Sequence, residues 1–407
     1  MSLFWCCRTP AIAKRGTLQC GRPADYRSGI ERGAEDEPKG VERMRQIILY
    51  SLFISIIGVV LPIATPLTAQ VRDSLDDPSF IVKEPAKAVL LSIARAGNTL
   101  VAVGERGIII TSKDGKSWKQ AVVPSSDSLT VVKFVSANKG WAAGHSGLVL
   151  HTENGGQTWT RQLDGWMAAQ LASAAIKARF GGKTTPEAKS QLENATRLVH
   201  EGPDKPFLDL EFEDEQKGIV VGAYGMILRT EDGGKTWTSW IDRLDNPEGH
   251  HLYAVAKIGR DIYIAGEQGL FFHSSDDGEH FKKIATPYAG TYFGMVMTPG
   301  GEVILAGMKG TIMRFNGRSF TAVDSPSKAN LGAITWLQDG RLLLLNQAGQ
   351  MLISRDKGKT VELLGLPPLP PSGGMIDTGD GTIMAVGMGG VIPVSLATAP
   401  ERQGEAQ

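Results

Sequence analysis

The sequence predicts an all-β chain that folds as a seven-bladed β-propeller with an inserted helical hairpin. The first observation is a short motif that recurs along the chain: RTEDGGKTW at 229–237 returns as HTENGGQTW, TSKDGKSW, HSSDDGEHF and ISRDKGKTV. A Gly-x-x-Gly pair and a few apolar residues precede each copy, and weaker copies bring the repeats to seven, spaced by roughly 40 residues. The second observation is that each repeat contains four short strand-like runs. A four-stranded repeat of this length is the unit of a propeller blade.

The strands of the first repeat are short β-branched or apolar runs separated by Gly, Asn and Asp, which is typical of strands joined by tight turns. They are LLSIAR (90–95), TLVAVG (99–104), GIIITS (107–112) and KQAVVP (119–124). The third strands of later repeats, GLVLH, GMILR and GLFFH, are apolar without alternation. Strands that are buried on both faces have this composition, as blades stacked on their neighbours require.

One step between repeats is nearly twice as long as the others, and two predicted helices fill it. They cover WMAAQLASAAIKARF (166–180) and PEAKSQLENATRLVHEG (186–202), where Thr185 is the expected N-cap and Pro186 the first helical residue. Apolar stripes on the two helices predict that they pair as a hairpin between blades two and three and pack on the propeller. The stripe residues are Met167, Leu171 and Ala175, and Leu192, Ala195 and Val199.

The seventh repeat ends after GVIPVS without a fourth strand. A ring left open at that point would expose a sheet edge. We therefore expect SFIVKEP (79–85), which precedes the first repeat, to supply the missing strand and close the ring.

The N-terminal region predicts an exported protein. Residues 44–69 begin at Met44, contain an apolar run from Ile47 to Leu61 and end with small residues, which indicates a signal peptide cleaved after Ala69. The alternative is an uncleaved membrane anchor. Because export machinery reads a free N-terminus, we expect residues 1–43, which hold all three cysteines, to be an over-extended reading frame. The mature propeller would then span 70–396, followed by a polar tail (397–407), in the periplasm or a compartment like the thylakoid lumen.

The recurring motif predicts a turn between the third and fourth strands of a blade. An acidic or amide side chain folds back on backbone N–H groups, and an aromatic side chain leaves the turn to pack on the blade. The turn residues are Asp114, Asn154, Asp232, Asp276 and Asp356. The aromatic residues are Trp118, Trp159, Trp237 and Phe281, with Val361 in the sixth copy. These motifs resemble the Asp-box, or BNR, repeats of sialidases, some glucanases and sorting receptors.

Seven such repeats, Gly-x-x-Gly third-strand entries and an export signal together resemble the photosystem II stability and assembly factor family of cyanobacteria and chloroplasts, with relatives in other bacteria. The resemblance covers about residues 80–396, and the helical pair is an addition to the family's pattern. It implies a non-catalytic scaffold, without a cofactor, that binds assembly intermediates of a membrane protein complex on the lumenal side. The chain has 43 basic and 43 acidic residues, so nothing indicates a nucleic-acid partner, and we expect a monomer.

The alternative function is an Asp-box glycoside hydrolase, sialidase-like or glucanase-like. Arg229, Arg314 and Arg355 lie in or beside the motif, where we expect them to solvate the exterior. The best acidic candidates are Asp209, Glu211 and Glu213 in LDLEFEDE (208–215). Period two places these three carboxylates on one face of the first strand of blade three, lining the central channel, where they could hold a cation or perform acid–base chemistry. The simpler interpretation is a solvated strand with Glu211 paired to Lys133. The seven histidines show no metal-ligand spacing.

The turns between second and third strands predict the partner face. In a propeller these turns emerge on the same face as the connections between blades, which here include the helical pair, and the Asp-box turns emerge on the opposite face. The turn dipeptides differ from blade to blade, as contact residues do. The expected partner face contains Arg106, His145, Tyr224, Glu267 and Lys309. We expect Tyr224 and Arg106 to be anchors, because Tyr and Arg side chains dominate interface energetics.

Overall fold

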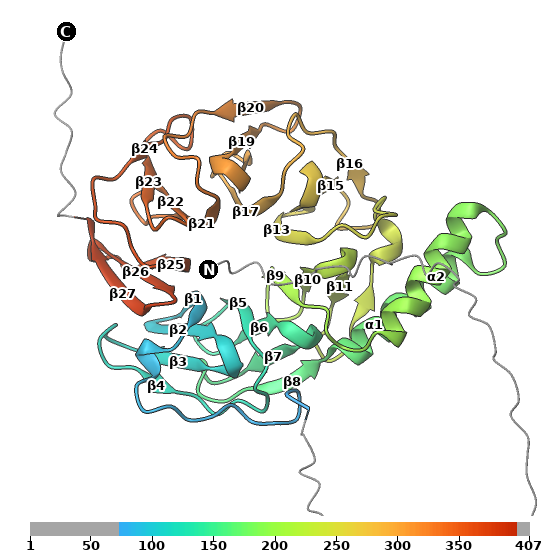
Figure 1. Cartoon of the computed structure of the whole chain (residues 1–407), viewed down its shortest axis with the longest axis horizontal. Helices are drawn as coiled ribbons and strands as arrows, with labels where there is room; N and C mark the ends of the chain where they lie inside the picture. Colours follow the sequence, from blue (N-terminus) through green and yellow to red (C-terminus); the bar gives the residue numbers. More distant parts are fainter. Residues whose placement is uncertain (1–72, 397–407) are drawn as a thin grey trace, which may run out of the picture. The chain divides into compact units, whose positions relative to one another are not determined.

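The computed structural model describes residues 73–396, which form a ring of seven antiparallel sheets around a central channel (Figure 1). The predicted all-β propeller with a helical hairpin is therefore confirmed. The predicted signal segment (44–69), the residues before it and the tail from 397 lie outside the described residues.

The blades follow one another along the chain, and within each sheet the strands lie in sequence order from the channel outward. Blades one and two comprise β1 (Leu90–Ala96), β2 (Thr99–Gly104), β3 (Ile109–Ser112), β4 (Lys119–Gln120), β5 (Leu129–Phe134), β6 (Gly140–Gly144), β7 (Val149–Thr152) and β8 (Thr160–Leu163). Blades three and four comprise β9 (Phe207–Phe212), β10 (Gly218–Gly222), β11 (Ile227–Thr230), β12 (Thr238–Ser239), β13 (Leu252–Ile258), β14 (Asp261–Gly266), β15 (Phe271–Ser274) and β16 (Lys282–Lys283). Blades five to seven comprise β17 (Tyr292–Met297), β18 (Val303–Gly307), β19 (Ile312–Phe315), β20 (Phe320–Val323), β21 (Leu331–Trp336), β22 (Leu342–Asn346), β23 (Met351–Ser354), β24 (Glu362–Leu363), β25 (Ser372–Asp377), β26 (Thr382–Gly387) and β27 (Gly390–Ser395).

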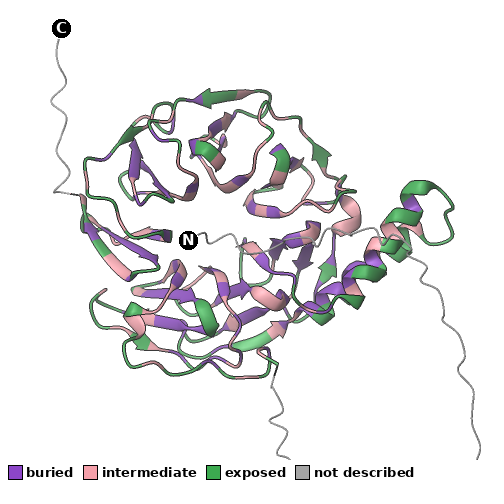
Figure 2. Cartoon of the chain, viewed as in Figure 1, coloured by how far each residue is buried: buried purple, intermediate pink, exposed green. Residues whose placement is uncertain are grey.

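The core lies between neighbouring blades, as the unbroken apolar third strands predict. The second strands are buried along almost their whole length, and burial falls toward the outer strands (Figure 2). Between blades two and three, the ring of Trp141 on β6 stacks on that of Phe212 on β9, with centroids 3.6 Å apart. The Trp237 ring lies nearly perpendicular to the same phenyl ring, with centroids 6.4 Å apart. Trp237 belongs to the apolar cluster that contains Trp141 of blade two and Phe212 of blade three, so an Asp-box aromatic helps to join two blades as well as to anchor its own turn.

The predicted closing strand is wrong. The seventh sheet has three strands, and residues 79–85 run along the outer edge of blade one instead. Ser79 N donates to Val123 O at 3.1 Å, and Val82 N donates to Gln120 Oε1 at 2.9 Å. Because blade one already satisfies these backbone groups, they are not available to β27. A short 3₁₀ turn, η1 (Pro85–Lys87), packs on β27 without forming a strand.

The seam between the first and last blades is closed by packing. Leu90 and Leu100 of blade one share an apolar cluster with Met384 and Val386 of blade seven. At the channel, β1 lies against β25, and the guanidinium of Arg95 donates to the carbonyl of Asp377 at 2.9 Å. The ring is thus continuous although, within residues 73–396, blades one and seven share no backbone ladder.

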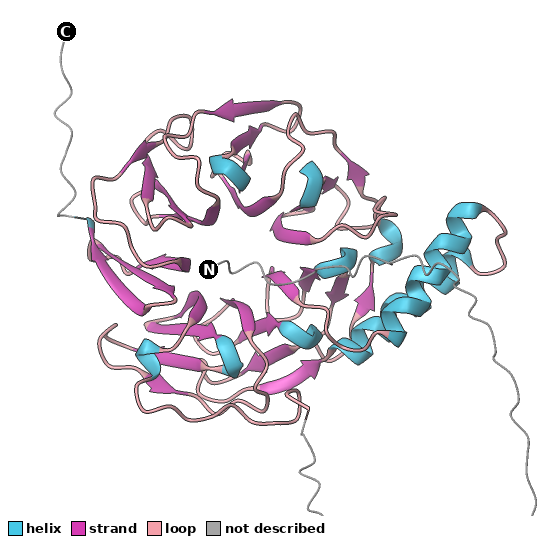
Figure 3. Cartoon of the chain, viewed as in Figure 1, coloured by secondary structure: helices cyan, strands magenta, loops and turns pink. Residues whose placement is uncertain are grey.

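The helical hairpin consists of α1 (Gly165–Phe180) and α2 (Pro186–His200), shown in cyan at the side of the ring in Figure 3. The hydroxyl of Thr185 accepts a hydrogen bond from Ala188 N at 3.2 Å, so the predicted cap is confirmed. The predicted stripe on α1 is one residue out of register. Ala168, Ala172 and Ile176 face the core, whereas Met167 is 46% exposed. Alanine-rich sequence offers little contrast between its faces, which explains the error.

Candidate functional site

The propeller has two faces of different construction. On one, each turn between second and third strands packs against the connection between blades. A Cβ added to Gly147 in such a turn would lie 2.4 Å from the Cα of Gly165, where α1 begins. On the other face, the Asp-box turns pack against the turns between first and second strands. In blade two, for example, Gly155 N donates a hydrogen bond to Asn138 O at 2.9 Å. We call these surfaces the helix-bearing face and the Asp-box face.

Five turns on the helix-bearing face have the same backbone conformation. In the first, Ile108 N donates to Glu105 O at 3.1 Å, and both central residues have positive φ, 55° at Arg106 and 68° at Gly107. This is the geometry of a type I′ hairpin turn, in which Asn-Gly is the preferred pair. The first central residues here are Arg106, Ser146, Tyr224, Gln268 and Lys309. The turn geometry does not favour any of these five residue types at this position. Their side chains can therefore differ between blades and can serve contact with another molecule.

The expected partner-face residues differ in how accessible they are. Arg106 and Lys309 are exposed, and Glu267 and His145 are half-buried. Burial lowers the pKa of His145. A carboxylate oxygen of Glu267 accepts a hydrogen bond from the backbone N–H of His251 at 2.8 Å. The Glu267 side chain is thus held by a hydrogen bond, whereas the two cations face solvent.

Tyr224 is held by its surroundings. Its backbone N lies 3.2 Å from Nδ1 of His251, and the two rings have centroids 5.2 Å apart. The ammonium of Lys205 lies 5.9 Å from the centre of the tyrosine ring. Tyr224 therefore presents a pre-positioned, half-buried ring at the base of the helices.

In every copy the Asp-box turn side chain accepts a hydrogen bond from a Ser or Thr hydroxyl two residues earlier and from backbone N–H groups that follow it. In blade three, Oδ1 of Asp232 accepts from the Thr230 hydroxyl at 2.9 Å and from Thr236 N at 2.9 Å. The Trp237 indole N–H donates to Gly234 O at 3.1 Å. Asn154 makes the equivalent bonds to Thr152, Gln157 and Thr158 in blade two, so an amide serves as well as a carboxylate.

Hydrogen bonds to these carboxylates lower their pKa values. Donation from the backbone N–H of Ser117 is the main cause for Asp114, and donation from His280 N is the main cause for Asp276. At Asp356 burial acts in the opposite direction, but the bonds from Thr360 and Ser354 outweigh it and bring the pKa to about 2. In the four boxes that contain aspartate, the carboxylate charge is thus stabilised by hydrogen bonds within its own turn.

The carboxylates of Asp209, Glu211 and Glu213 in blade three, which we call the acid row, contact groups of the neighbouring blades. Glu211 Oε2 lies 2.6 Å from the Lys133 ammonium, as the simpler interpretation expects. Asp209 accepts hydrogen bonds from Leu210 N at 2.9 Å and, across the next blade boundary, from Val255 N at 3.0 Å. Burial raises the pKa of Asp209. Glu213, just beyond the end of β9, pairs with Lys257 at 3.1 Å. The three carboxylates thus face other protein groups, and the geometry lends no support to a glycosidase.

A charge cluster with two buried cations joins blades three and four, and the sequence did not reveal it. Arg229 on β11 is 3% exposed, so the prediction that it solvates the exterior is wrong. Its Nη2 lies 3.6 Å from Asp277 Oδ2, and its Cζ lies 5.5 Å from the centre of the Trp240 ring. Asp277 also lies 2.9 Å from the ammonium of Lys257. We call Glu213, Arg229, Lys257 and Asp277 the blade three–four cluster. The one sequence signal for it was an arginine inside an otherwise apolar third strand.

The other two arginines are paired with carboxylates of their own blades. Arg314 contacts Glu302, and Arg355, half exposed, contacts Glu362. With Arg229 buried, these three side chains do not converge on one carboxylate-binding site of the sialidase kind.

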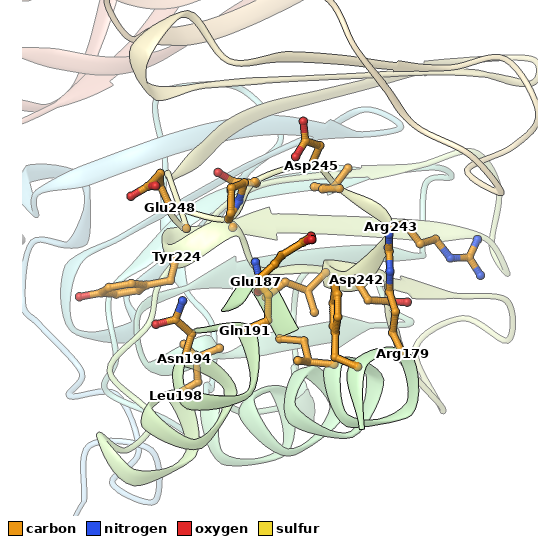
Figure 4. Close-up of a pocket in the computed structure, with 18 of the residues that line it drawn as sticks. Arg179, Glu187, Gln191, Asn194, Leu198, Tyr224, Asp242, Arg243, Asp245 and Glu248 are labelled. Atoms are coloured by element: carbon orange, nitrogen blue, oxygen red, sulfur yellow. The ribbon is translucent and has the colours of Figure 1, made fainter. Parts of the chain in front are cut away.

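A groove on the helix-bearing face lies between the hairpin and the connection from blade three to blade four (Figure 4). Its volume is about 340 Å³. One wall is α2 with the end of α1, and the other is residues 241–249, which include a 3₁₀ turn, η5 (Ile241–Arg243). Tyr224 lies at one end of the groove. Sequence reasoning missed this feature because its walls are separated along the chain and meet only in the fold.

A second hollow lies on the Asp-box face between blades two and three and is lined mainly by polar residues. Its Lys139 and Glu215 form an ion pair at 2.8 Å, which neutralises part of its charge. Within residues 73–396, His, Cys, Asp and Glu side chains form no group of three suited to a metal ion. Across the same residues, no helix combines the length and apolarity needed to cross a bilayer.

Sequence comparisons find likeness to photosystem II assembly factors. The family model described as "Photosynthesis system II assembly factor YCF48" matches residues 81–171 and 189–289. The break between the two segments falls within the helical hairpin. Photosystem II assembly lipoprotein Ycf48 of Synechococcus sp. (strain CC9902) is 26% identical over 158 residues, which are 38% of this chain and 47% of that protein.

Two further curated relatives have related descriptions. Photosystem II assembly protein Ycf48 of Synechococcus sp. (strain JA-2-3B'a(2-13)) is 27% identical over 212 residues, 47% of this chain and 59% of that protein. The chloroplastic photosystem II stability/assembly factor HCF136 of Oryza sativa subsp. japonica is 29% identical over 86 residues, 20% of this chain and 21% of that protein. The chain thus spans about half the length of the first two curated relatives that it matches.

Solved structures of similar fold include "YCF48 bound to D1 peptide", with a TM-score of 0.54, 17% identity, and coverage of 78% of this chain and 98% of that one. YCF48 from Cyanidioschyzon merolae has a TM-score of 0.54 at 15% identity, with coverage of 78% and 97%. At this identity these structures establish likeness of fold.

Proposed function

We propose, from the premise that this chain is a photosystem II assembly factor-like Asp-box propeller, that it is a non-catalytic, exported scaffold for the assembly of a membrane protein complex. The observation that carries the proposal is the contrast between the helix-bearing face and the channel. The channel carboxylates are occupied by Lys133, Lys257 and backbone N–H groups. The helix-bearing face presents exposed, blade-specific side chains and a groove.

The partner in this proposal is a membrane protein or its assembly intermediate, bound by a monomeric propeller. One of the solved relatives is described as bound to a D1 peptide, which supports a polypeptide partner for a propeller of this fold. Arg106 and Lys309 are the exposed cations of the partner face, and Tyr224 is its pre-positioned aromatic side chain. Arginine and tyrosine are the side chains most often found at the energetic centre of an interface.

Partner capture from solubilised envelope membranes tests the docking face. Three variants are compared with the unaltered chain: replacement of residues 166–202 by a short Gly-Ser bridge, Tyr224→Ala and Arg106→Ala. Each should keep a folded propeller, as judged by circular dichroism and melting temperature, and should capture less of the membrane partner. Undiminished capture by all three folded variants would exclude this face.

The non-catalytic part of the proposal has its own test. Glu211→Gln and Asp209→Asn should change stability and leave partner capture intact, because we assign these side chains to the packing of neighbouring blades. Hydrolysis of sialoside or glucan substrates by the unaltered chain, lost in Glu211→Gln at unchanged melting temperature, would restore the glycosidase alternative.

Export is proposed from the signal-like segment at 44–69 and supported by the curated relatives, one described as a lipoprotein and one as chloroplastic. The mature protein would lie in the periplasm or in a lumen-like compartment. N-terminal sequencing of the protein from its native host should begin at or near Gln70. Peptides containing Cys6 or Cys20 in the mature protein would contradict this, and a start at Met44 would instead indicate a retained anchor.

A further inference from the structure

The rim of the groove on the helix-bearing face carries unbalanced negative charge. Four lining carboxylates make no ion pair with any residue in the described part of the chain: Glu187, Asp242, Asp245 and Glu248. Two of the three lining arginines are paired with carboxylates that do not line the groove, Arg197 with Glu201 at 3.7 Å and Arg243 with Glu279 at 3.5 Å. Arg179 is left as the lining cation without an ion pair among residues 73–396. The rim therefore complements a cation.

One wall of the groove offers unused amide groups. Gln191 and Asn194 lie one turn apart on α2, line the groove and are half-buried (Figure 4). Neither side chain makes a hydrogen bond to another described residue. A carboxamide carries both a donor and an acceptor, which is the pairing that a peptide backbone satisfies. Half-buried amides without protein partners favour a ligand that can bond to them over one that cannot.

The floor of the groove is apolar. Phe180, Ile241 and Phe281 are half-buried, above the buried side chains of Ile176 and Leu244. Phe281 is the Asp-box aromatic of blade four, so one of the motif residues also contributes to this surface. A concave site with an apolar floor and a few polar groups at its edge is typical of ligand and peptide pockets.

From these three features we infer that the groove binds an extended segment of the protein partner that carries lysine or arginine beside an apolar side chain. The rim carboxylates bind the cation, the amides of Gln191 and Asn194 bind the backbone, and the floor receives the apolar side chain. An anionic ligand such as a phosphate would meet the four carboxylates at the rim. The inference rests on the proposed function, because it specifies the chemistry by which the helix-bearing face recognises its partner.

Fluorescence anisotropy with the full chain tests the inference directly. The probe is a short fluorescein-labelled peptide in which lysines alternate with alanine and leucine, and matched peptides carry glutamine or glutamate at the lysine positions. The lysine peptide should bind most tightly. Its affinity should fall as ionic strength rises, because the rim carboxylates are exposed. Equal binding of the glutamate peptide would overturn the inference.

Charge-neutralising variants locate the binding. Glu187→Gln/Asp245→Asn removes two exposed rim charges and should weaken the lysine peptide by about five- to twentyfold. Glu105→Gln/Asp324→Asn removes two exposed charges away from the groove and serves as the matched control, with affinity expected to be unchanged. Equal loss in both variants, or no loss in the rim variant, would overturn the inference. Gln191→Leu/Asn194→Leu should lower the affinity for the lysine and glutamine peptides alike, since it removes the hydrogen bonds to the peptide backbone.

The same variants separate failure of this inference from failure of the proposed function. If replacement of the hairpin abolishes capture of the membrane partner while Glu187→Gln/Asp245→Asn alters neither capture nor peptide affinity, the face is correct and the groove chemistry is wrong. If the lysine peptide binds as expected but capture is undiminished in both variants, the groove chemistry is correct and docking on this face is wrong.

Discussion

The ammonium nitrogen of Lys133 lies 2.6 Å from Oε2 of Glu211, across the boundary between blades two and three. Burial acts to lower the pKa of Lys133, but the negative charges of Glu211 and Asp209 outweigh it and the pKa is raised. The lysine is therefore charged throughout the neutral range, and it compensates a row of carboxylates that would otherwise repel one another inside the channel.

Removal of this lysine should destabilise the ring. Lys133→Met leaves Glu211 and Asp209 without their cation, and we expect the free energy of unfolding to fall by about 1–3 kcal/mol. The range extends down to about 1 kcal/mol because water in the channel screens the ion pair: the Lys133 side chain is 40% exposed and that of Glu211 is 26% exposed. Denaturant titration measures the change. The double variant Lys133→Met/Glu211→Gln should recover part of the loss, and a single variant as stable as the unaltered chain would show that the pair contributes nothing.

The Asp-box turns should make stability depend on acid pH. Asp356 has a folded-state pKa of about 2, below the value of about 3.9 expected in an unfolded chain. A lowered folded-state pKa contributes stability that is fully present above the unfolded value and is lost as pH falls through the folded value. The melting temperature should therefore drop as pH falls from about 4 toward 2.

Blade two supplies the control for this pH effect. Asn154 makes the equivalent turn bonds without an ionisable group. Asp356→Asn should accordingly fold with its turn intact and show a smaller loss of melting temperature in the same acid window. An identical pH profile in the two proteins would mean that the Asp356 carboxylate is not linked to stability.

Within one Asp-box, the aromatic side chain should contribute more to the free energy of unfolding than the turn side chain does. Trp237→Ala removes a buried indole that packs between two blades and should cost about 3–5 kcal/mol of unfolding free energy. Asp232→Ala removes turn hydrogen bonds and should cost about 1–2 kcal/mol. Thermal and denaturant unfolding of both variants checks the order, which would be reversed if the box served mainly as a charged site.

In the blade three–four cluster, replacement of the shared carboxylate should lower stability more than replacement of the buried arginine. Asp277→Asn keeps a residue that tolerates the positive φ of 65° at this position but removes the carboxylate shared by Arg229 and Lys257. Two cations that are 3% and 4% exposed then lose a counter-charge, and we expect a cost of about 2–4 kcal/mol. Arg229→Met removes a buried cation and leaves Asp277 with Lys257, so it should cost less. A larger loss for Arg229→Met would place the main contribution in the packing of Arg229 against Trp240.

Local features of the fold were predictable from sequence, and contacts between distant segments were not. The repeats set the blades because each blade is built from consecutive strands and turns, and Thr185 with Pro186 marked the start of α2. The pairing of Glu211 with Lys133 followed from equivalent positions in neighbouring repeats. The burial of Arg229 depends on Asp277 in the next blade, and the groove depends on two connections meeting in space, so neither has a periodic signal.

The packed seam between blades seven and one has a consequence for the order of folding. Arg95 and Asp377, which meet across it, are 282 residues apart, whereas Trp336 and Met297, bonded across an ordinary blade boundary, are 39 apart. Closure of the longer loop costs about 2 kcal/mol more chain entropy than closure of the shorter one. No inter-terminal ladder among the described residues offsets that difference. Blades can therefore form in succession along the chain while the ring is still open, and the seam is the interface to form last and to separate first. Amide hydrogens of β1 and of β25–β27 should then exchange sooner than those of the middle blades.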